Sequence, residues 1–396
     1  MNITSKLKRL KFLDFPSRRK ILFYDFIPKN IRNTCFKFNG NHYIFDKNKK
    51  INFFIFLSIF IDYKSIKAIF IDNLITAYTL SYIRFVKPNI IINSTDNNIN
   101  FYRLKKYFPG IYFLVYQNGA RHIVNDLFGI KTLINKNNYK NFSADYIFTF
   151  NSAIGKMYEK YINCKTIPIG NIKNNKINLN CVSIKNGKIV YISQFRPHNL
   201  ERKYVYSDGE KVCSVSKWLE TEKKLIPKLC KYANKKNLEL YVLGAAKDYI
   251  TVQKEKSYFR KIALGEPWKY WNPYKLNFKE RYQSLDKFEL VINVWSTLGY
   301  ELFGRYKKVC FFRQNIKNLN DRNFGWPESF SKKGFWYSSY ITQSEVNRVL
   351  DNLRDISLRE WIEKTNLARK KVMKYDKNNS IIKNKLNYLI LKKNCA

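Results

Sequence analysis

A short polar segment near residue 296 has the residue types needed to hold a phosphate group. Ser296, Thr297 and Gly299 follow an apolar run over residues 290–294, and helical spacing of apolar residues begins directly after them. The first N–H groups of a helix lack intrahelical partners and carry partial positive charge, so an anion can bind there with help from the two hydroxyls. Glu301 follows closely enough to accept hydrogen bonds from a ribose diol. The pattern also fits an ordinary helix N-cap, and it is not a Walker loop, because the chain contains no Gly-Lys-Ser or Gly-Lys-Thr.

Short apolar runs alternate with amphipathic segments along most of the chain, which is typical of parallel α/β proteins. The two clearest amphipathic segments end at Pro88 and Pro109, where helices are expected to stop. We expect strands over residues 21–26, 68–71, 89–94, 111–119, 145–151, 188–195, 238–245, 289–296 and 308–312. We expect helices over residues 73–88, 97–109, 218–237 and 281–288, and two or three more after residue 344.

This alternation is interrupted over residues 165–188, which are rich in Asn, Lys, Pro and Gly. A chain of 396 residues is also longer than one core usually supports. We therefore expect an α/β protein of two Rossmann-like doubly wound domains facing a central cleft, with ligands at the carboxyl ends of the strands. The expected parts are an N-terminal domain (1–171), a linker (172–187), a C-terminal domain (188–343) and terminal helices (344–396) that pack back across the domains.

The composition is strongly basic, with 73 Lys and Arg against 30 Asp and Glu and a net charge of +43. Such a charge favours nucleic acid, anionic lipid headgroups or phosphorylated substrates as partners. Seven cysteines without a Cys-x-x-Cys motif and three scattered histidines predict reduced thiols in a cytosolic protein without a structural zinc site. The basic N-terminus lacks the apolar region of a signal peptide. The most apolar segment, 51–61, is too short to span a bilayer, and it predicts either a buried strand or core helix, or a membrane-facing patch.

Four segments together resemble the GT-B glycosyltransferases, and more narrowly the bacterial transferases of surface carbohydrate (O-antigen or capsule) biosynthesis. Residues 285–312, LDKFELVINVWSTLGYELFGRYKKVCFF, are similar to the nucleotide-sugar site of these enzymes. The other segments are 92–121, with its Asp-Asn-Asn, Gln-Asn-Gly and Arg elements, 144–175, and 189–196. They follow the family's order, but the first 90 residues and the tail match no family that we can name. The chain also departs from the usual small residue after the helix's glutamate motif, since it has Phe303-Gly304-Arg305 there.

The resemblance implies a donor site in the C-terminal domain, built around Ser296, Thr297, Gly299 and Glu301. Five other residues would complete it. They are Arg196, which would neutralise the phosphate leaving group, Ser193 and Gln194 in the same loop, Gly244, which would leave room for the base, and Glu266, which would hydrogen-bond the nucleoside.

The acceptor site is expected in the N-terminal domain. An inverting transfer needs a carboxylate that takes a proton from the acceptor hydroxyl, and Asp96, after a predicted strand, is the candidate base. His122 is a rival base, and N-capping the next helix is the alternative role of Asp96. The residues expected to hold sugar hydroxyls or an anionic group are Asn97, Gln117, Asn118 and Arg121. Because no Asp-x-Asp element follows a strand, we expect no metal and no cofactor beyond a CMP-, UDP- or dTDP-linked sugar as co-substrate.

These expectations describe a cytoplasmic glycosyltransferase that extends a surface polysaccharide or a lipid-linked glycan. An anionic membrane surface is a candidate partner at the inner face of the cytoplasmic membrane, which basic residues 1–20 could contact. One alternative is a GT-B enzyme of other chemistry, such as a nucleotide-sugar epimerase or a glycerol-phosphate transferase. A nucleic-acid-binding protein is the other alternative, although the basic residues are spread along the chain and no nucleic-acid-binding signature is visible.

Overall fold

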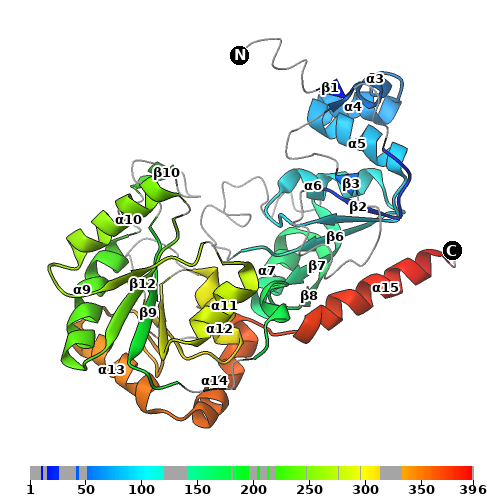
Figure 1. The fold of residues 1–396 in the computed structure, drawn as a ribbon. Helices are drawn as coiled ribbons and strands as arrows, with labels where there is room; N and C mark the ends of the chain where they lie inside the picture. The colour runs from blue at the N-terminus through cyan, green and yellow to red at the C-terminus, as the bar shows by residue number, and fades with distance from the viewer. Residues whose placement is uncertain are drawn as a thin grey trace. The chain divides into compact units, whose positions relative to one another are not determined.

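The structure is a computed structural model, and its chain forms two compact units that are described separately below (Figure 1). The first unit comprises residues 1–118, 133–172 and 379–396, and the second comprises 119–132 and 173–378. The residues that the structure describes are 10–11, 16–25, 42–43, 51–119, 141–179, 182, 184–195, 203–205, 212–214, 219–246, 248–274, 276–294, 296–312 and 332–394.

The first unit is built on a six-stranded parallel sheet of order β3-β2-β5-β6-β7-β8. Its strands are β2 (Ile21–Phe23), β3 (His42–Tyr43), β5 (Ile90–Asn93), β6 (Tyr112–Tyr116), β7 (Ser143–Thr149) and β8 (Asn163–Pro168). Every residue of β5 is buried, as expected for a central strand covered on both faces. The expected strands at 21–26, 89–94, 111–119 and 145–151 are thus confirmed, and β8 follows the last of them.

Five helices of the first unit begin at asparagine or aspartate residues that follow strands or turns. They are α3 (Phe53–Ser58), α4 (Tyr63–Ile71), α5 (Leu74–Val86), α6 (Ile99–Leu104) and α7 (Ser152–Tyr161). The side chains of Asn73 and Asn151 accept hydrogen bonds from the first turns of α5 and α7. A short parallel pair, β1 (Leu10–Lys11) with β4 (Ile51–Asn52), precedes α3, and a 3-10 turn (Lys105–Tyr107) extends α6.

The expected strand at 68–71 is wrong, because these residues form the second half of α4. Asp62 caps this helix by accepting a hydrogen bond from the Ser65 N–H at 2.6 Å. The helix buries Ser65 and Ala68 and leaves Phe70 and Ile71 exposed. A run of four apolar residues has no periodicity that separates a strand from a helix, and the preceding cap decides the outcome.

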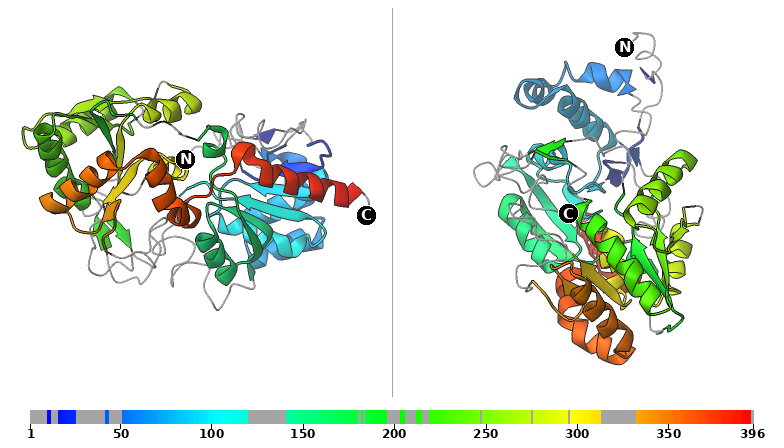
Figure 2. Two further views of the ribbon diagram at one scale, coloured as in Figure 1. Left: turned by 90° about the horizontal axis from the view of Figure 1, so that it is seen from below. Right: turned by 90° about the vertical axis from the view of Figure 1, so that its left-hand side faces the viewer.

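The last helix of the chain, α15 (Ser380–Asn394), packs on the sheet of the first unit (Figure 2). Ile382, Leu386 and Leu389 are buried in one cluster with strand residues such as Phe23 and Ile92. The chain therefore returns from the second unit to complete the core of the first.

The second unit contains another six-stranded parallel sheet, of order β13-β12-β9-β14-β15-β16. Its strands are β9 (Lys188–Ile192), β12 (Glu239–Leu243), β13 (Lys269–Trp271), β14 (Leu290–Asn293), β15 (Val309–Phe312) and β16 (Tyr337–Ser338). Its helices are α9 (Glu220–Lys235), α10 (Tyr249–Ile262), α11 (Phe278–Asp286), α12 (Thr297–Gly304), α13 (Gln343–Asp355) and α14 (Leu358–Val372). This unit also contains a small antiparallel pair, β10 (Lys203–Val205) with β11 (Val212–Ser214), and a 3-10 turn (Asn174–Lys176).

The predicted linker at 172–187 is packed over its first half. Asn174 and Asn175 are fully buried, and the Asn174 side chain donates to the Glu301 carbonyl at 3.0 Å. Asn175 accepts from the N–H of Asp376 at 3.0 Å, so this stretch holds α12 and the segment after α14 within the second unit. The tail expected at 344–396 is accordingly divided, with α13 and α14 in the second unit and α15 in the first.

Among the described residues, no helix combines the length and apolar character needed to cross a membrane.

Candidate functional site

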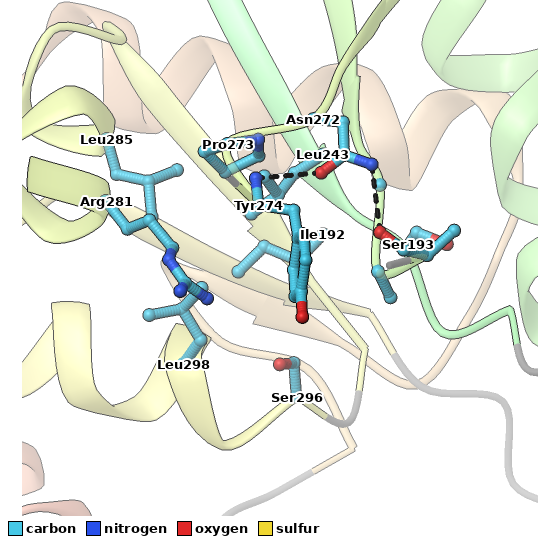
Figure 3. A pocket seen from close by; sticks show the side chains of 13 residues that line it. Ile192, Ser193, Leu243, Asn272, Pro273, Tyr274, Arg281, Leu285, Ser296 and Leu298 are labelled. Carbon is cyan, nitrogen blue, oxygen red and sulfur yellow. Dashed lines mark hydrogen bonds between the residues drawn. The ribbon is translucent and has the colours of Figure 1, made fainter. Parts of the chain in front are cut away.

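A cavity of about 180 Å³ opens at the carboxyl ends of β9, β12 and β14, which are neighbours in the second sheet (Figure 3). Three residues predicted from the sequence, Ser193, Gly244 and Ser296, line it together. The others are Ile192, Leu243, Ala245, Ala246, Asn272, Pro273, Tyr274, Arg281, Leu285 and Leu298. The residues that follow the three strand ends meet here because parallel strands place their carboxyl ends at one edge of the sheet.

The start of α12 is shaped by Asn293, the last residue of β14. The Asn293 side chain accepts from the Ser296 N–H and donates to the Ser296 carbonyl, both at 3.1 Å. Ser296 is the N-cap of the helix, but its hydroxyl makes no capping hydrogen bond. That hydroxyl is therefore available to a ligand in the cavity, at the positive end of the α12 dipole.

Gly299 is required by the protein itself. A Cβ atom at this position would overlap the side chain of Asn293, which folds across the first turn of α12. The sequence suggested that Gly299 lets the backbone approach a ligand, whereas in the structure the space beside it is filled by Asn293.

Arg281, from α11, supplies the cation of this cavity. Its Nε donates to the Leu276 carbonyl at 2.9 Å, and its guanidinium carbon lies 5.7 Å from the centre of the Tyr274 ring. Figure 3 shows the guanidinium beside Leu298, above Ser296. Sequence reasoning missed Arg281 because it comes from the side of a polar helix and not from a strand end. The loop that carries Tyr274 is held by Asn272, which accepts from the Tyr274 N–H and donates to the Ala246 carbonyl, both at 2.9 Å.

Glu255 of α10 organises the wall of the cavity from behind. Its carboxylate is fully buried and accepts four hydrogen bonds. The donors are the Ser193 hydroxyl, the N–H groups of Ala245 (3.1 Å) and Ala246 (3.2 Å), and the Tyr270 hydroxyl (2.6 Å). We call these five residues the Glu255 cluster. Because it joins the segments after β9 and β12 to β13, it fixes the shape of the edge where the cavity lies.

Gly244 belongs to the same arrangement. A Cβ atom there would overlap the Tyr270 hydroxyl, which donates to Glu255. Gly244 was expected to leave room for a nucleobase. It does line the cavity, and its missing side chain makes room for Tyr270.

The other predicted donor residues lie around the cavity or away from it. The Gln194 N–H donates to Glu222 at 3.2 Å, next to Ser193, while Thr297 opens α12 beside Ser296 without lining the cavity. Glu266 precedes β13, at the amino end of that strand, and the structure does not bring it to the cavity. Arg196 lies outside the described residues.

Glu301 points into the interior of the second unit. It accepts a hydrogen bond from the Tyr282 hydroxyl, and burial raises the pKa of its carboxyl to about 7. Burial has the same effect on the Glu222 carboxyl, whose pKa also rises to about 7. The Glu301 carboxyl does not line the cavity. Its expected contact with a ribose diol is therefore not visible in the structure and stays a prediction.

We predict that Glu301→Gln makes the unfolding free energy less sensitive to pH. The folded chain holds the Glu301 proton more tightly than the unfolded chain, because burial raises the carboxyl pKa from 4.5 to about 7. This stabilisation is complete below the unfolded pKa and is lost as pH rises through the folded value. The free energy of unfolding of the variant, measured with denaturant, should therefore rise relative to that of the wild type between about pH 5 and about pH 8. A difference that is independent of pH would contradict this assignment.

In the first unit, the predicted acceptor residues follow β5 and β6. Asp96 is fully buried, and its carboxylate accepts from the Tyr158 hydroxyl and from the Asn118 N–H at 3.2 Å. The Gln117 side chain accepts from the Phe150 N–H at 2.9 Å, which joins β6 to the end of β7. Asn97 and Asn118 are exposed, so they can meet a ligand.

Arg121 and His122 lie outside the described residues, so their expected roles stay predictions. Among the other first-unit residues, Asp96 and Asn118 are joined by a hydrogen bond and Gln117 precedes Asn118 in the chain. The burial of Asp96 favours a positioning role over direct proton transfer.

The residues that line the cavity of the second unit suit a ligand in which a small anion is joined to a ring. A guanidinium, a free N-cap hydroxyl and a helix N-terminus are the usual partners of phosphate oxygens. The Tyr274 ring and the apolar side chains around it offer a surface for a base or a sugar ring.

The sequence matches a known protein family. The model of the family Lept_O_ant_chp1, described as "putative O-antigen biosynthesis protein", matches residues 114–390. No curated protein matches this chain.

Solved structures resemble the chain over nearly its whole length. A variant of the wall teichoic acid polymerase TagF is 12% identical with a TM-score of 0.52, covering 99% of this chain and 92% of its own. The UDP-GlcNAc 2-epimerase from Methanocaldococcus jannaschii is 12% identical with a TM-score of 0.51, covering 93% of this chain and 99% of its own. The Gap123 glycosylation complex from Streptococcus agalactiae is 12% identical with a TM-score of 0.41 over 76% of this chain, which spans 56% of that chain. At such identities the likeness to the first two establishes the fold, which is GT-B.

Proposed function

Because this chain belongs to a family of O-antigen biosynthesis proteins and has the GT-B fold, we propose that it is a glycosyltransferase acting on a nucleotide-activated sugar. The acceptor would be a growing surface polysaccharide or a lipid-linked glycan. The donor would occupy the cavity at the carboxyl ends of β9, β12 and β14, with its phosphate beside Arg281 and Ser296.

The observation that carries the proposal is the meeting of Arg281 with Ser296, the N-cap residue of α12, in one cavity. When a glycosidic bond to a nucleotide breaks, negative charge develops on the leaving phosphate. A guanidinium and helix N–H groups that are already in place would stabilise this charge without reorganisation. The proposal therefore assigns leaving-group stabilisation to these protein groups and treats the reaction as metal-independent.

For the acceptor side we propose that Asp96, the predicted base, has a positioning role instead, because its buried carboxylate holds the Asn118 backbone at a strand end. Asn97 and Asn118 would then contact sugar hydroxyls, and the predicted rival base, His122, would take the acceptor proton in an inverting transfer.

A thermal-unfolding panel with CMP, UDP, GDP and dTDP tests the donor site. A nucleotide that binds only the folded chain, at 100 times its Kd, stabilises the chain by about 2.7 kcal/mol and should raise Tm by roughly 5–10 °C. We expect one nucleotide to act selectively and the effect to be lost in a Ser296→Ala, Thr297→Ala double variant. A panel in which no nucleotide shifts Tm would contradict the proposed donor site.

Product analysis distinguishes a glycosyltransferase from an enzyme of other chemistry on the same fold. A nucleotide-sugar epimerase would convert its donor with no acceptor present, and a glycerol-phosphate transferase would consume a glycerol-linked nucleotide. Weak, salt-sensitive and sequence-independent binding to nucleic acid would reflect only the net charge of +43.

A further inference from the structure

The first unit exposes a dense group of large apolar side chains on α3, α4 and the start of α5. Nine of the nineteen such side chains that are exposed in the described part of the chain lie between residues 54 and 75. We call them the α3–α5 surface, and they are Phe54, Leu57, Phe60, Ile61, Tyr63, Phe70, Ile71, Leu74 and Ile75. An apolar group of this density on a folded protein marks a contact surface.

The helical geometry of α4 separates an inner face from an outer face. Ser65 and Ala68 are fully buried, and the Ser65 hydroxyl lies 3.2 Å from that of Ser81 on α5. Tyr63, Lys67 and Phe70 recur at helical spacing on the opposite side, and Phe70 is 84% exposed. Figure 1 shows α3 and α4 beside α5, whose residues are mostly buried. The helices thus use one face to pack on α5 and leave an apolar face outside.

The charge of this surface is positive, because its two carboxylates are already paired. Asp62 accepts from Arg84 and caps α4. Asp72 accepts from the Tyr107 hydroxyl at 2.8 Å and lies 3.4 Å from the Lys106 ammonium.

Lys64 and Lys67 are available to bind an anionic partner outside the chain. Both are exposed on α4, and within the described residues neither forms an ion pair. Both lysines are thus exposed on the same helix as Tyr63 and Phe70, and no carboxylate in the described part of the chain pairs with them.

We propose that the α3–α5 surface docks on an anionic lipid bilayer. Aromatic and aliphatic side chains would enter the boundary between headgroups and acyl chains, while Lys64 and Lys67 would extend toward the anionic headgroups. A second copy of the chain fits less well, because it would bring the same lysines against one another. Helices of 6 and 9 residues would lie along the bilayer surface. This partner extends the proposed function and rests on it, because a lipid-linked acceptor would be met at such a surface.

Vesicle flotation of the full chain tests the proposal. The probes are vesicles of phosphatidylcholine alone and vesicles in which part of it is replaced by anionic phosphatidylglycerol. We expect binding to the anionic vesicles that persists partly in high salt, where exposed charges are screened. A Phe70→Ser, Ile71→Ser double variant should lower the partition coefficient roughly tenfold to 100-fold through lost apolar burial. A Lys64→Gln, Lys67→Gln variant should lower the preference for anionic vesicles about tenfold or more.

The matched control is a Tyr249→Ser, Ile250→Ser double variant. These residues are 76% and 68% exposed at the start of α10 in the second unit, so the control removes a similar apolar area elsewhere. It should bind as the wild type does. Equal loss in the control, full loss of wild-type binding in high salt, or unchanged binding of the Phe70→Ser, Ile71→Ser variant would overturn the proposal. Concentration-dependent dimerisation that this variant abolishes would assign the surface to a second copy instead.

The two proposals fail separately. Flotation is performed without donor or acceptor, so its failure leaves the nucleotide panel unaffected. The nucleotide panel is performed without lipid, so a flat panel leaves vesicle binding unaffected.

Discussion

Replacing Arg281 with glutamine should lower kcat/KM for the nucleotide-sugar donor by about 100-fold, the usual effect of removing one preorganised donor at a developing negative charge. The guanidinium lines the same cavity as Ser296, the N-cap of α12, and lies 5.7 Å from the centre of the Tyr274 ring. Its loss removes positive charge where the leaving phosphate gains negative charge, so kcat should fall more than KM rises. Steady-state kinetics with the nucleotide identified by thermal unfolding would measure both parameters.

The control for this variant is Arg260→Gln, an exposed arginine on α10 that does not line the cavity. It makes the same chemical change and lowers the net charge equally, so it should keep kcat/KM within about twofold, as surface substitutions usually do. Equal losses in the two variants would mean that the overall charge of the chain drives the effect. A loss confined to KM would make Arg281 a ground-state binding residue and not a stabiliser of the leaving group.

The residues of the donor cavity that the sequence predicted are those that follow strands. Ser193, Gly244 and Ser296 each come directly after an apolar run, and parallel topology alone brings such positions to one edge. Arg281 and Tyr274 could not be found in this way. Arg281 reaches the cavity from a helix, and Tyr274 reaches it from the loop after β13. Neither β13 nor α10 is among the predicted elements. Nothing in the polar, lysine-rich segment Tyr249–Ile262 indicates that its one carboxylate, Glu255, is buried.

The predictions that the structure corrects in other parts of the chain have similar causes. The apolar run at 68–71 predicts a strand, whereas in the structure it belongs to α4, from which Phe70 and Ile71 face outward. The packed stretch at Asn174 and Asn175 has the composition of a loop, because buried asparagines with backbone partners look like solvent-exposed ones in a sequence. The return of α15 to the first unit depends on long-range packing that local periodicity does not encode.

Glu255→Gln should lower the free energy of unfolding by about 3 kcal/mol, because it places an amide N–H₂ among buried donors and removes a charge that accepts from them. Both carboxylate oxygens of Glu255 accept hydrogen bonds within the Glu255 cluster, so no rotation of the amide can satisfy every donor. The corresponding loss in Tm is roughly 6–12 °C for a unit of this size.

Glu363→Gln is the matched control for that substitution. The Glu363 carboxylate is 63% exposed in a surface ion pair with Arg359, so this change should cost about 0.5 kcal/mol or less. A double-variant cycle with Ser193→Ala then measures how strongly the two residues are coupled in the free energy of unfolding. Removing the Ser193 hydroxyl first takes away one of the donors that the new amide would oppose, so the combined loss should be smaller than the sum of the single losses. Strict additivity would mean that Glu255 does not act through Ser193, and the segment after β9 would then owe its position to other contacts.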